Sequence, residues 1–147
     1  MKDIVIVDID GTISKIGDRL KYLQQSPKNW DAFYADSFKD EPIIEMVNLV
    51  KSLNVNYRIV FCTGRRESTR QITKEWIFKY MKNIWFPQIL MRPNNDLRPD
   101  EVVKIEQVKL AGINFDEIAF VLEDRSRMVS KWRSLGVRCL QVDVGDF

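Results

Sequence analysis

Two acidic side chains follow a short apolar run close to the N-terminus. The segment from Val7 to Thr12 reads Val-Asp-Ile-Asp-Gly-Thr, so Asp8 and Asp10 stand at positions i and i+2 before a glycine and a hydroxyl. At the carboxyl end of a buried parallel strand, these acids would lie where open α/β sheets bind ligands, and carboxylate oxygens suit Mg²⁺. The alternative is an ordinary Asp-Gly turn with both acids in solvent.

A second apolar run, residues 58–62, ends in groups that bind phosphate. Thr63 can donate a hydrogen bond, Gly64 lets backbone N–H groups approach an anion, and Arg65 can pair with two anionic oxygens. Taken alone, the same turn is more typical of a helix N-cap followed by solvated arginines.

A third apolar run, residues 118–122, also ends in acids, Glu123 and Asp124. Because the carboxyl ends of parallel strands lie on one edge of a sheet, we expect Asp8, Asp10 and Asp124 to meet Thr63 around one metal ion and one phosphate. Lys104, on the helix predicted before this run, would balance the negative charge. By itself, Lys104 is equally typical of a solvated helix surface.

The composition excludes several kinds of catalytic site. The chain has no histidine, which excludes Ser-His-Asp triads, Cys-His pairs and H-E-x-x-H zinc sites. Cys62 and Cys139 form no C-x-x-C pair and cannot build a four-thiolate zinc site. Ser68 stands where a C-x₅-R phosphatase loop needs arginine, so Cys62 is assigned to the core. Catalysis must use carboxylates, Lys, Arg, hydroxyls or a metal held by oxygen.

The length predicts one globular domain, residues 1–147, and the two cysteines, which cannot build a disulfide framework, predict a reducing cytoplasmic setting. The 23 basic and 21 acidic residues give a net charge of +2, too small to indicate nucleic-acid binding by charge alone. The N-terminus lacks the apolar region of a secretory signal, and no apolar run approaches the roughly 18 residues of a membrane span.

Short β-branched runs alternate with segments of helical period, which predicts an α/β fold of the Rossmann-like kind with about five parallel strands between helices. All five strands look apolar enough to be covered on both faces. They are predicted at residues 4–7, 58–62, 88–91, 118–122 and 138–142, with helices after Pro42 and around residues 72–80, 102–108 and 128–135. A loop is predicted over residues 92–99, which are rich in turn formers.

An insertion of about residues 13–41 follows the first strand and predicts a small cap. Ser26-Pro27 is a helix start signal, after which Trp30, Phe33, Tyr34 and Phe38 fall on one side. These aromatic rings could stack on a base, although their helical spacing favours packing within the insertion.

The order of these motifs resembles the four-motif signature of haloacid dehalogenase (HAD) superfamily phosphatases. The resemblance implies a Mg²⁺-dependent phosphomonoesterase in which Asp8 forms an aspartyl-phosphate and Asp10 acts as acid and then as base. Thr63 and Lys104 would stabilise the transferring phosphoryl group. The implied metal ligands are Asp8, Asp124, Glu123 and the backbone carbonyl of Asp10.

Further segments are similar to the 3′-phosphatase domains of bacteriophage polynucleotide kinase/phosphatases. The similarity implies that Arg19, Gly64, Arg65 and Asp100 engage the substrate or organise the site, although Arg19, Arg65 and Asp100 are also typical of surface salt bridges. No glycine precedes a lysine, so the chain contains no P-loop of a kinase. Glu123 departs from the usual aspartate and reaches farther, so it would hold metal directly or through water.

The leading hypothesis is therefore a phosphatase that removes 3′-phosphates from nucleic-acid ends. The first alternative is the same chemistry on free nucleoside monophosphates. The second is a phosphate-binding module without activity, which retention of all four motifs disfavours. The expected partners are phosphorylated nucleic-acid ends or nucleotides, with no membrane and no obligatory protein partner.

Overall fold

The structure is a computed structural model that describes residues 1–145. The described strands are β1 (Ile4–Val7), β2 (Arg58–Arg66), β3 (Gln88–Arg92), β4 (Ile118–Arg125) and β5 (Cys139–Gly145). The α-helices are α1 (Trp30–Ala35), α2 (Ile44–Leu53), α3 (Arg70–Tyr80), α4 (Asp100–Leu110) and α5 (Ser126–Ser134). Short 3-10 turns are η1 (Gly17–Tyr22), η2 (Asp36–Lys39), η3 (Glu67–Thr69) and η4 (Phe115–Glu117).

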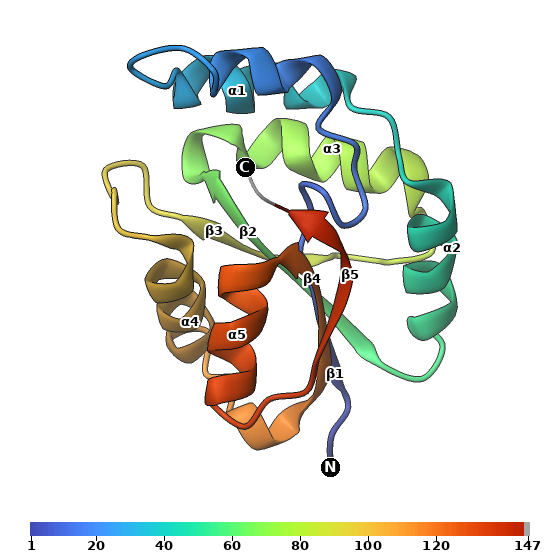
Figure 1. Cartoon of the computed structure of the whole chain (residues 1–147). Helices are drawn as coiled ribbons and strands as arrows, with labels where there is room; N and C mark the ends of the chain where they lie inside the picture. Colours follow the sequence, from blue (N-terminus) through green and yellow to red (C-terminus); the bar gives the residue numbers. More distant parts are fainter. Residues whose placement is uncertain (146–147) are drawn as a thin grey trace.

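The described strands form one parallel sheet in the order β3-β2-β1-β4-β5, with helices on both faces (Figure 1). Alternation along β1 sorts its side chains between the two layers. Ile4 and Ile6 pack with residues of α4 and α5, whereas Val5 and Val7 pack with residues of α2 and α3. The predicted α/β, Rossmann-like fold with a parallel sheet is confirmed. The chain turns from one side of β1 to the other, and open sheets bind ligands beside such a reversal.

All five predicted strands are present, and four of them run farther than expected. The register shifts after Cys62 in β2 and after Glu123 in β4, so both strands carry an irregularity at the carboxyl edge. Such irregularities re-aim side chains next to active sites. The expectation that every strand is covered on both faces is wrong for β5, an edge strand whose residues are mostly exposed.

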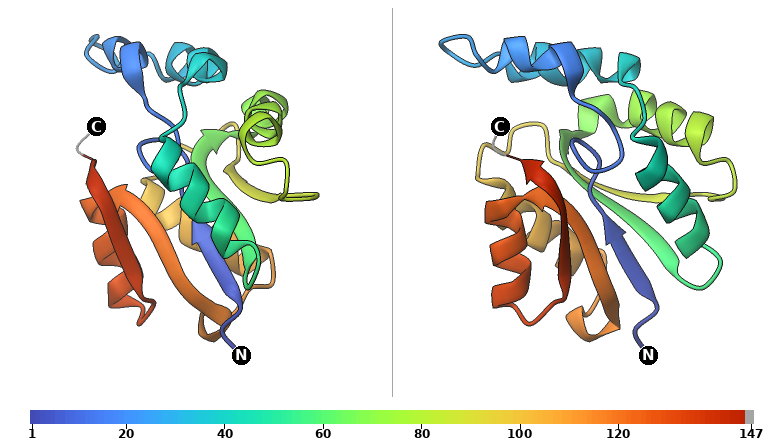
Figure 2. Two further views of the ribbon diagram at one scale, coloured as in Figure 1. Left: turned by 90° about the vertical axis from the view of Figure 1, so that its right-hand side faces the viewer. Right: turned by 45° about the vertical axis from the view of Figure 1, so that its right-hand side comes forward.

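The segment between β1 and α2 holds η1, α1 and η2, and it lies over the carboxyl edge of the sheet (Figures 1 and 2). The predicted helix start at Ser26-Pro27 is wrong, because α1 begins at Trp30, where Asn29 accepts a hydrogen bond from the backbone N–H of Ala32. Phe33 and Tyr34 are buried as expected, but Phe38 is 57% exposed because it lies in η2.

Within residues 1–145, we find no helix long and apolar enough to cross a bilayer.

Candidate active site

Asp8 lies at the carboxyl end of β1 and contacts a lysine of α4. The alternation that sends Ile4 and Ile6 toward α4 and α5 sends Asp8 the same way. Its Oδ1 accepts a hydrogen bond from Lys104 Nζ at 2.7 Å, and its Oδ2 accepts one from Thr12 Oγ1 at 3.0 Å. Both side chains of the ion pair are buried. The Asp8 carboxylate is therefore fixed at both oxygens.

Asp8, Glu123 and Asp124 form a buried acidic cluster in which each offers a carboxylate oxygen, all within 4.8 Å of one another. Two glycines make room for it. A Cβ on Gly11 or on Gly145 would lie 2.2 Å from Asp124 Oδ2, and Gly11 also has a φ of +82°. Both positions therefore exclude a side chain for steric reasons, and Gly11 does so for its backbone conformation as well.

The crowding of these acids changes their proton affinity. Burial, and then the charge of Glu123, raises the pKa of Asp8 well above its usual range. The same two causes raise the pKa of Asp124 to about 7. Buried oxygen donors that repel one another when ionised fit a hard divalent cation such as Mg²⁺, which would stabilise their charged forms.

Glu123 has both carboxylate oxygens engaged with the protein. Its Oε2 accepts from Lys104 Nζ at 2.8 Å, while its Oε1 accepts from the backbone N–H groups of Asp124 at 3.1 Å and Arg125 at 3.3 Å. The charges of Asp8 and Glu123 outweigh burial and raise the pKa of Lys104 well above its usual range. Lys104 is thus a buried cation between two acids.

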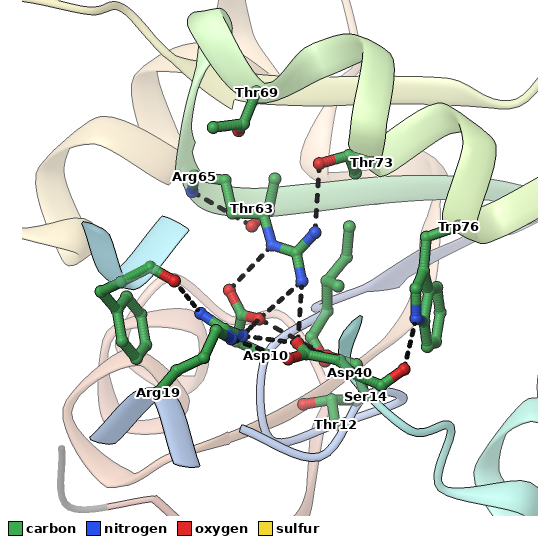
Figure 3. Close-up of polar contacts among 12 residues, drawn as sticks. Asp10, Thr12, Ser14, Arg19, Asp40, Thr63, Arg65, Thr69, Thr73 and Trp76 are labelled. Atoms are coloured by element: carbon green, nitrogen blue, oxygen red, sulfur yellow. Dashed lines mark hydrogen bonds and ion pairs between the residues drawn. The ribbon is translucent and has the colours of Figure 1, made fainter. Parts of the chain in front are cut away.

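Asp10 lies in a separate network with two arginines and a second aspartate (Figure 3). Arg65 binds both Asp10 oxygens, with Nε at 3.0 Å from Oδ2 and Nη2 at 2.7 Å from Oδ1. Arg19 Nη2 lies 2.6 Å from Asp10 Oδ1. Arg19 also binds both oxygens of Asp40, at 2.7 Å through Nε and 2.6 Å through Nη2. All four side chains are buried, so two positive charges face two negative ones.

This quartet holds Asp10 in its ionised form. Burial alone would raise the pKa of Asp10, but the charges and hydrogen bonds of Arg65 and Arg19 hold it well below its usual range. Because its carboxylate is occupied by guanidinium groups, the side chain of Asp10 lies outside the acidic cluster. Arg19 also donates to the backbone carbonyl of Phe33 at 2.7 Å and so ties α1 to the quartet.

Thr63 and Gly64 lie in β2, and Thr63 is buried. Thr63 Oγ1 accepts the backbone N–H of Arg65 at 3.1 Å, which leaves the hydroxyl proton free to be donated elsewhere. A Cβ on Gly64 would lie 2.6 Å from Asp100 Oδ1. The glycine therefore allows β2 to approach the start of α4.

Asp100 is held by two arginines. It accepts hydrogen bonds from Arg92 and from Arg125 Nη1, the latter at 2.5 Å. Burial opposes ionisation, but the charges of Lys104, Arg125 and Arg92 keep the pKa of Asp100 below its usual value. The site residues expected from the sequence thus fall into three groups. Asp8, Glu123 and Asp124 form the acidic cluster with Lys104, Asp10, Arg19 and Arg65 form the quartet with Asp40, and Asp100 forms a triad with Arg92 and Arg125. Thr63 and Gly64 lie in β2.

Sequence reasoning missed Asp40 and Arg92. Asp40 carried a weak signal, an acid just before Pro42 in a segment assigned to the cap. Arg92 was assigned to a loop, but it is a buried strand residue that also donates to the backbone carbonyls of Gly64, Asp96 and Arg98. Cys62 is core as predicted, and burial raises the pKa of its thiol to about 12.

A family model described as the polynucleotide kinase PNKP phosphatase domain, of the HAD class, matches residues 2–147. The chain belongs to this family. This PNKP phosphatase domain is 28% identical over 135 residues to a protein of Autographa californica nuclear polyhedrosis virus that is named as a bifunctional polynucleotide kinase/RNA ligase. That match covers 90% of this chain and 18% of the viral protein.

Solved structures place the PNKP phosphatase domain within the HAD fold. A chain of the Pnkp1/Rnl/Hen1 RNA repair complex is 30% identical with a TM-score of 0.80, over 99% of this chain and 44% of that one. A HAD family enzyme of Bacteroides thetaiotaomicron, solved with magnesium and inorganic phosphate, is 12% identical with a TM-score of 0.60, over 100% and 97% of the two chains. The PNKP phosphatase domain thus spans less than half of the viral protein and of the RNA repair chain. It is a HAD-type phosphatase.

Proposed function

We propose that this phosphatase removes 3′-phosphates from nucleic-acid ends, with Mg²⁺ as cofactor and Asp8 as the nucleophile. The observation that carries the proposal is the Asp8 carboxylate, fixed by Lys104 and Thr12 inside a buried acidic cluster. The family supports the class of substrate, since its model is described as the phosphatase domain of a polynucleotide kinase and the viral relative is named as a polynucleotide kinase. A cytoplasmic setting and a single domain over residues 1–147 stay predictions.

In the first half of the reaction, an Asp8 oxygen bonds to phosphorus while the bond from phosphorus to the leaving 3′ oxygen breaks, and Asp10 protonates that oxygen. In the second half, Asp10 takes a proton from the water that attacks phosphorus, and phosphate leaves Asp8. The guanidinium groups of Arg19 and Arg65 favour ionised Asp10. Ionised Asp10 is therefore ready to take a proton from water. For Asp10 to protonate the leaving oxygen, its contacts with Arg19 and Arg65 must weaken when substrate binds.

Magnesium held by Asp8, Asp124 and the backbone carbonyl of Asp10 would screen the repulsion between the nucleophile and the phosphate. Glu123 would hold the metal directly or through water, and its oxygens also accept hydrogen bonds from Lys104 and from backbone N–H groups. Lys104 and the free proton of Thr63 would stabilise the phosphoryl oxygens during transfer.

The test is phosphate release with Mg²⁺ from a 3′-phosphorylated oligonucleotide, compared with 3′- and 5′-mononucleotides. We expect preference for the oligonucleotide and complete loss of turnover in Asp8→Asn, because an amide cannot form the aspartyl-phosphate. Retained activity in Asp8→Asn would exclude the mechanism. Preference for 5′-mononucleotides would identify a nucleotidase, and inactivity on every substrate would support a binding module.

A pair of variants tests the metal ligands. Asp124→Ala should abolish the dependence on magnesium, whereas Glu123→Ala should lower the rate through Lys104 and keep that dependence. The opposite pattern would show that Glu123 is the primary ligand.

A further inference from the structure

A pocket of about 200 Å³ lies between α1 and the loop that leads into α4. Its walls include Asp100 and Arg125, which belong to the Asp100 triad, and Arg66, which follows Arg65 of the quartet. The pocket therefore adjoins Asp100 and its arginine partners on the side of the cap.

Four guanidinium groups and two aromatic rings line this pocket. Arg66, Arg92, Arg98 and Arg125 contribute positive charge, Asp96 and Asp100 contribute negative charge, and Trp30 and Tyr34 contribute the rings. The charges are already oriented, because Arg66 pairs with Asp31 while Arg92 and Arg125 pair with Asp100. A flat aromatic surface beside fixed cations suits a nucleoside attached to phosphate.

Trp30 differs from the other aromatic residues of α1. Phe33 and Tyr34 are 1% and 9% exposed, and the guanidinium of Arg19 lies 4.3 Å from the centre of the Phe33 ring. Trp30 is only half-buried. Its indole stacks on Tyr34, with centroids 5.8 Å apart and planes inclined by 25°, and meets the edge of Phe33. The packing on Tyr34 thus holds the indole in place at the pocket.

The surroundings of the indole are also cationic. Lys28 Nζ lies over the Trp30 ring at 5.7 Å from its centre, and Lys28 is exposed. Lys28 therefore adds a cation beside the indole.

We propose that this pocket binds the nucleoside that carries the scissile phosphate, with its base stacked on Trp30. The inference rests on the proposed function and makes it more specific. Trp30 is a substrate-positioning residue with no part in the chemistry.

A second aromatic surface provides a matched control. Phe78, Trp85 and Phe86 are 66%, 81% and 95% exposed and border a groove with Lys74 and Lys82. They lie at the end of α3 and in the connection to β3, which places them toward the amino edge of the sheet, away from the acidic cluster. Trp85 therefore shares the chemistry of Trp30 without its position.

The experiment is a double-mutant cycle that removes the tryptophan and the base separately. Values of kcat/KM are measured with 3′-phosphorylated oligonucleotides whose terminal sugar carries a base or lacks one. Because stacking one base on an aromatic ring changes binding by about 5- to 150-fold, wild type should prefer the intact end by a factor in that range. Trp30→Ala should lose this preference, Trp30→Phe should keep most of it, and Trp85→Ala should match wild type.

The outcomes separate the two proposals. If Trp30→Ala lowers kcat/KM equally for both substrates, or for neither, the residue only supports the cap and the inference is wrong. If Trp85→Ala removes the preference, the nucleic acid binds at the other aromatic surface. If wild type hydrolyses neither oligonucleotide but does hydrolyse mononucleotides, the proposed function has failed and the inference with it. Thermal melting of each variant identifies any loss caused by unfolding.

Discussion

Replacing Asp40 by alanine should destabilise the fold through a buried charge. In the wild-type protein, Asp10 and Asp40 balance Arg19 and Arg65, and all four side chains are nearly inaccessible to water. Asp40→Ala removes one negative charge and both hydrogen bonds that Asp40 accepts from Arg19 in its forked geometry. One guanidinium charge would then be buried without a counterion.

The expected loss follows from these contacts. Breaking a buried ion pair by removing one partner costs about 3–5 kcal/mol. Burial raises the pKa of Asp40, which shows that part of its desolvation cost is not recovered in the folded state. Removing the carboxylate relieves that part, so we expect a loss near the lower limit, about 3 kcal/mol. For a domain of this size, that loss lowers Tm by roughly 6–12 °C.

Urea unfolding of wild type, Asp40→Ala and the control Asp18→Ala provides the assay. Asp18 is an exposed acid in η1, next in sequence to Arg19, so its removal changes the net charge equally without opening the quartet. Asp18→Ala should stay within about 0.5 kcal/mol of wild type. A loss below about 1 kcal/mol in Asp40→Ala would refute the view that the quartet is a balanced buried unit.

Two further predictions concern the glycine cradle and Asp100. Gly11→Ala should destabilise the protein more than Gly17→Ala and reduce activity, because both glycines have positive φ but only the Cβ at Gly11 would overlap Asp124, whereas nothing lies within 4 Å at Gly17; equal losses in a denaturation comparison would remove the steric argument. The low pKa of Asp100 contributes stability above about pH 4 that is lost as the pH falls through the folded-state pKa, so the difference in unfolding free energy between wild type and Asp100→Asn at pH 7 should shrink as the pH falls below about 4; a constant difference would show that Asp100 does not act through its charge.

The strands and the edge of the sheet could be predicted because local signals agree with the tertiary environment. Runs such as residues 4–7 are apolar, β-branched and ended by acids, and they become strands with those acids at the carboxyl edge. The exposure of β5 could not be predicted in this way. Gln141 and Asp143 interrupt its apolar residues, but the order of strands in the sheet determines that it lies at an edge.

The proximity of Asp8 and Asp124 could be predicted, because each is an acid at the carboxyl end of a parallel strand. Asp40 and Arg92 act through partners distant in sequence, Arg19 and Asp100, and neither spacing nor periodicity reports such pairs. The separation of Asp10 from the acidic cluster was also not visible, because two residues of spacing cannot show that guanidinium groups compete for one carboxylate.

The hydrogen bonds of Glu123 determine which acidic residue can occupy its position. One carboxylate joins Lys104 of α4 to two backbone N–H groups at the tip of β4. An aspartate is shorter by one carbon, about 1.5 Å, and could not span both partners at their present distances. Glu123→Asp would therefore break a contact between α4 and the tip of β4. Glutamate and aspartate are not interchangeable at this position, although both carry the same charge.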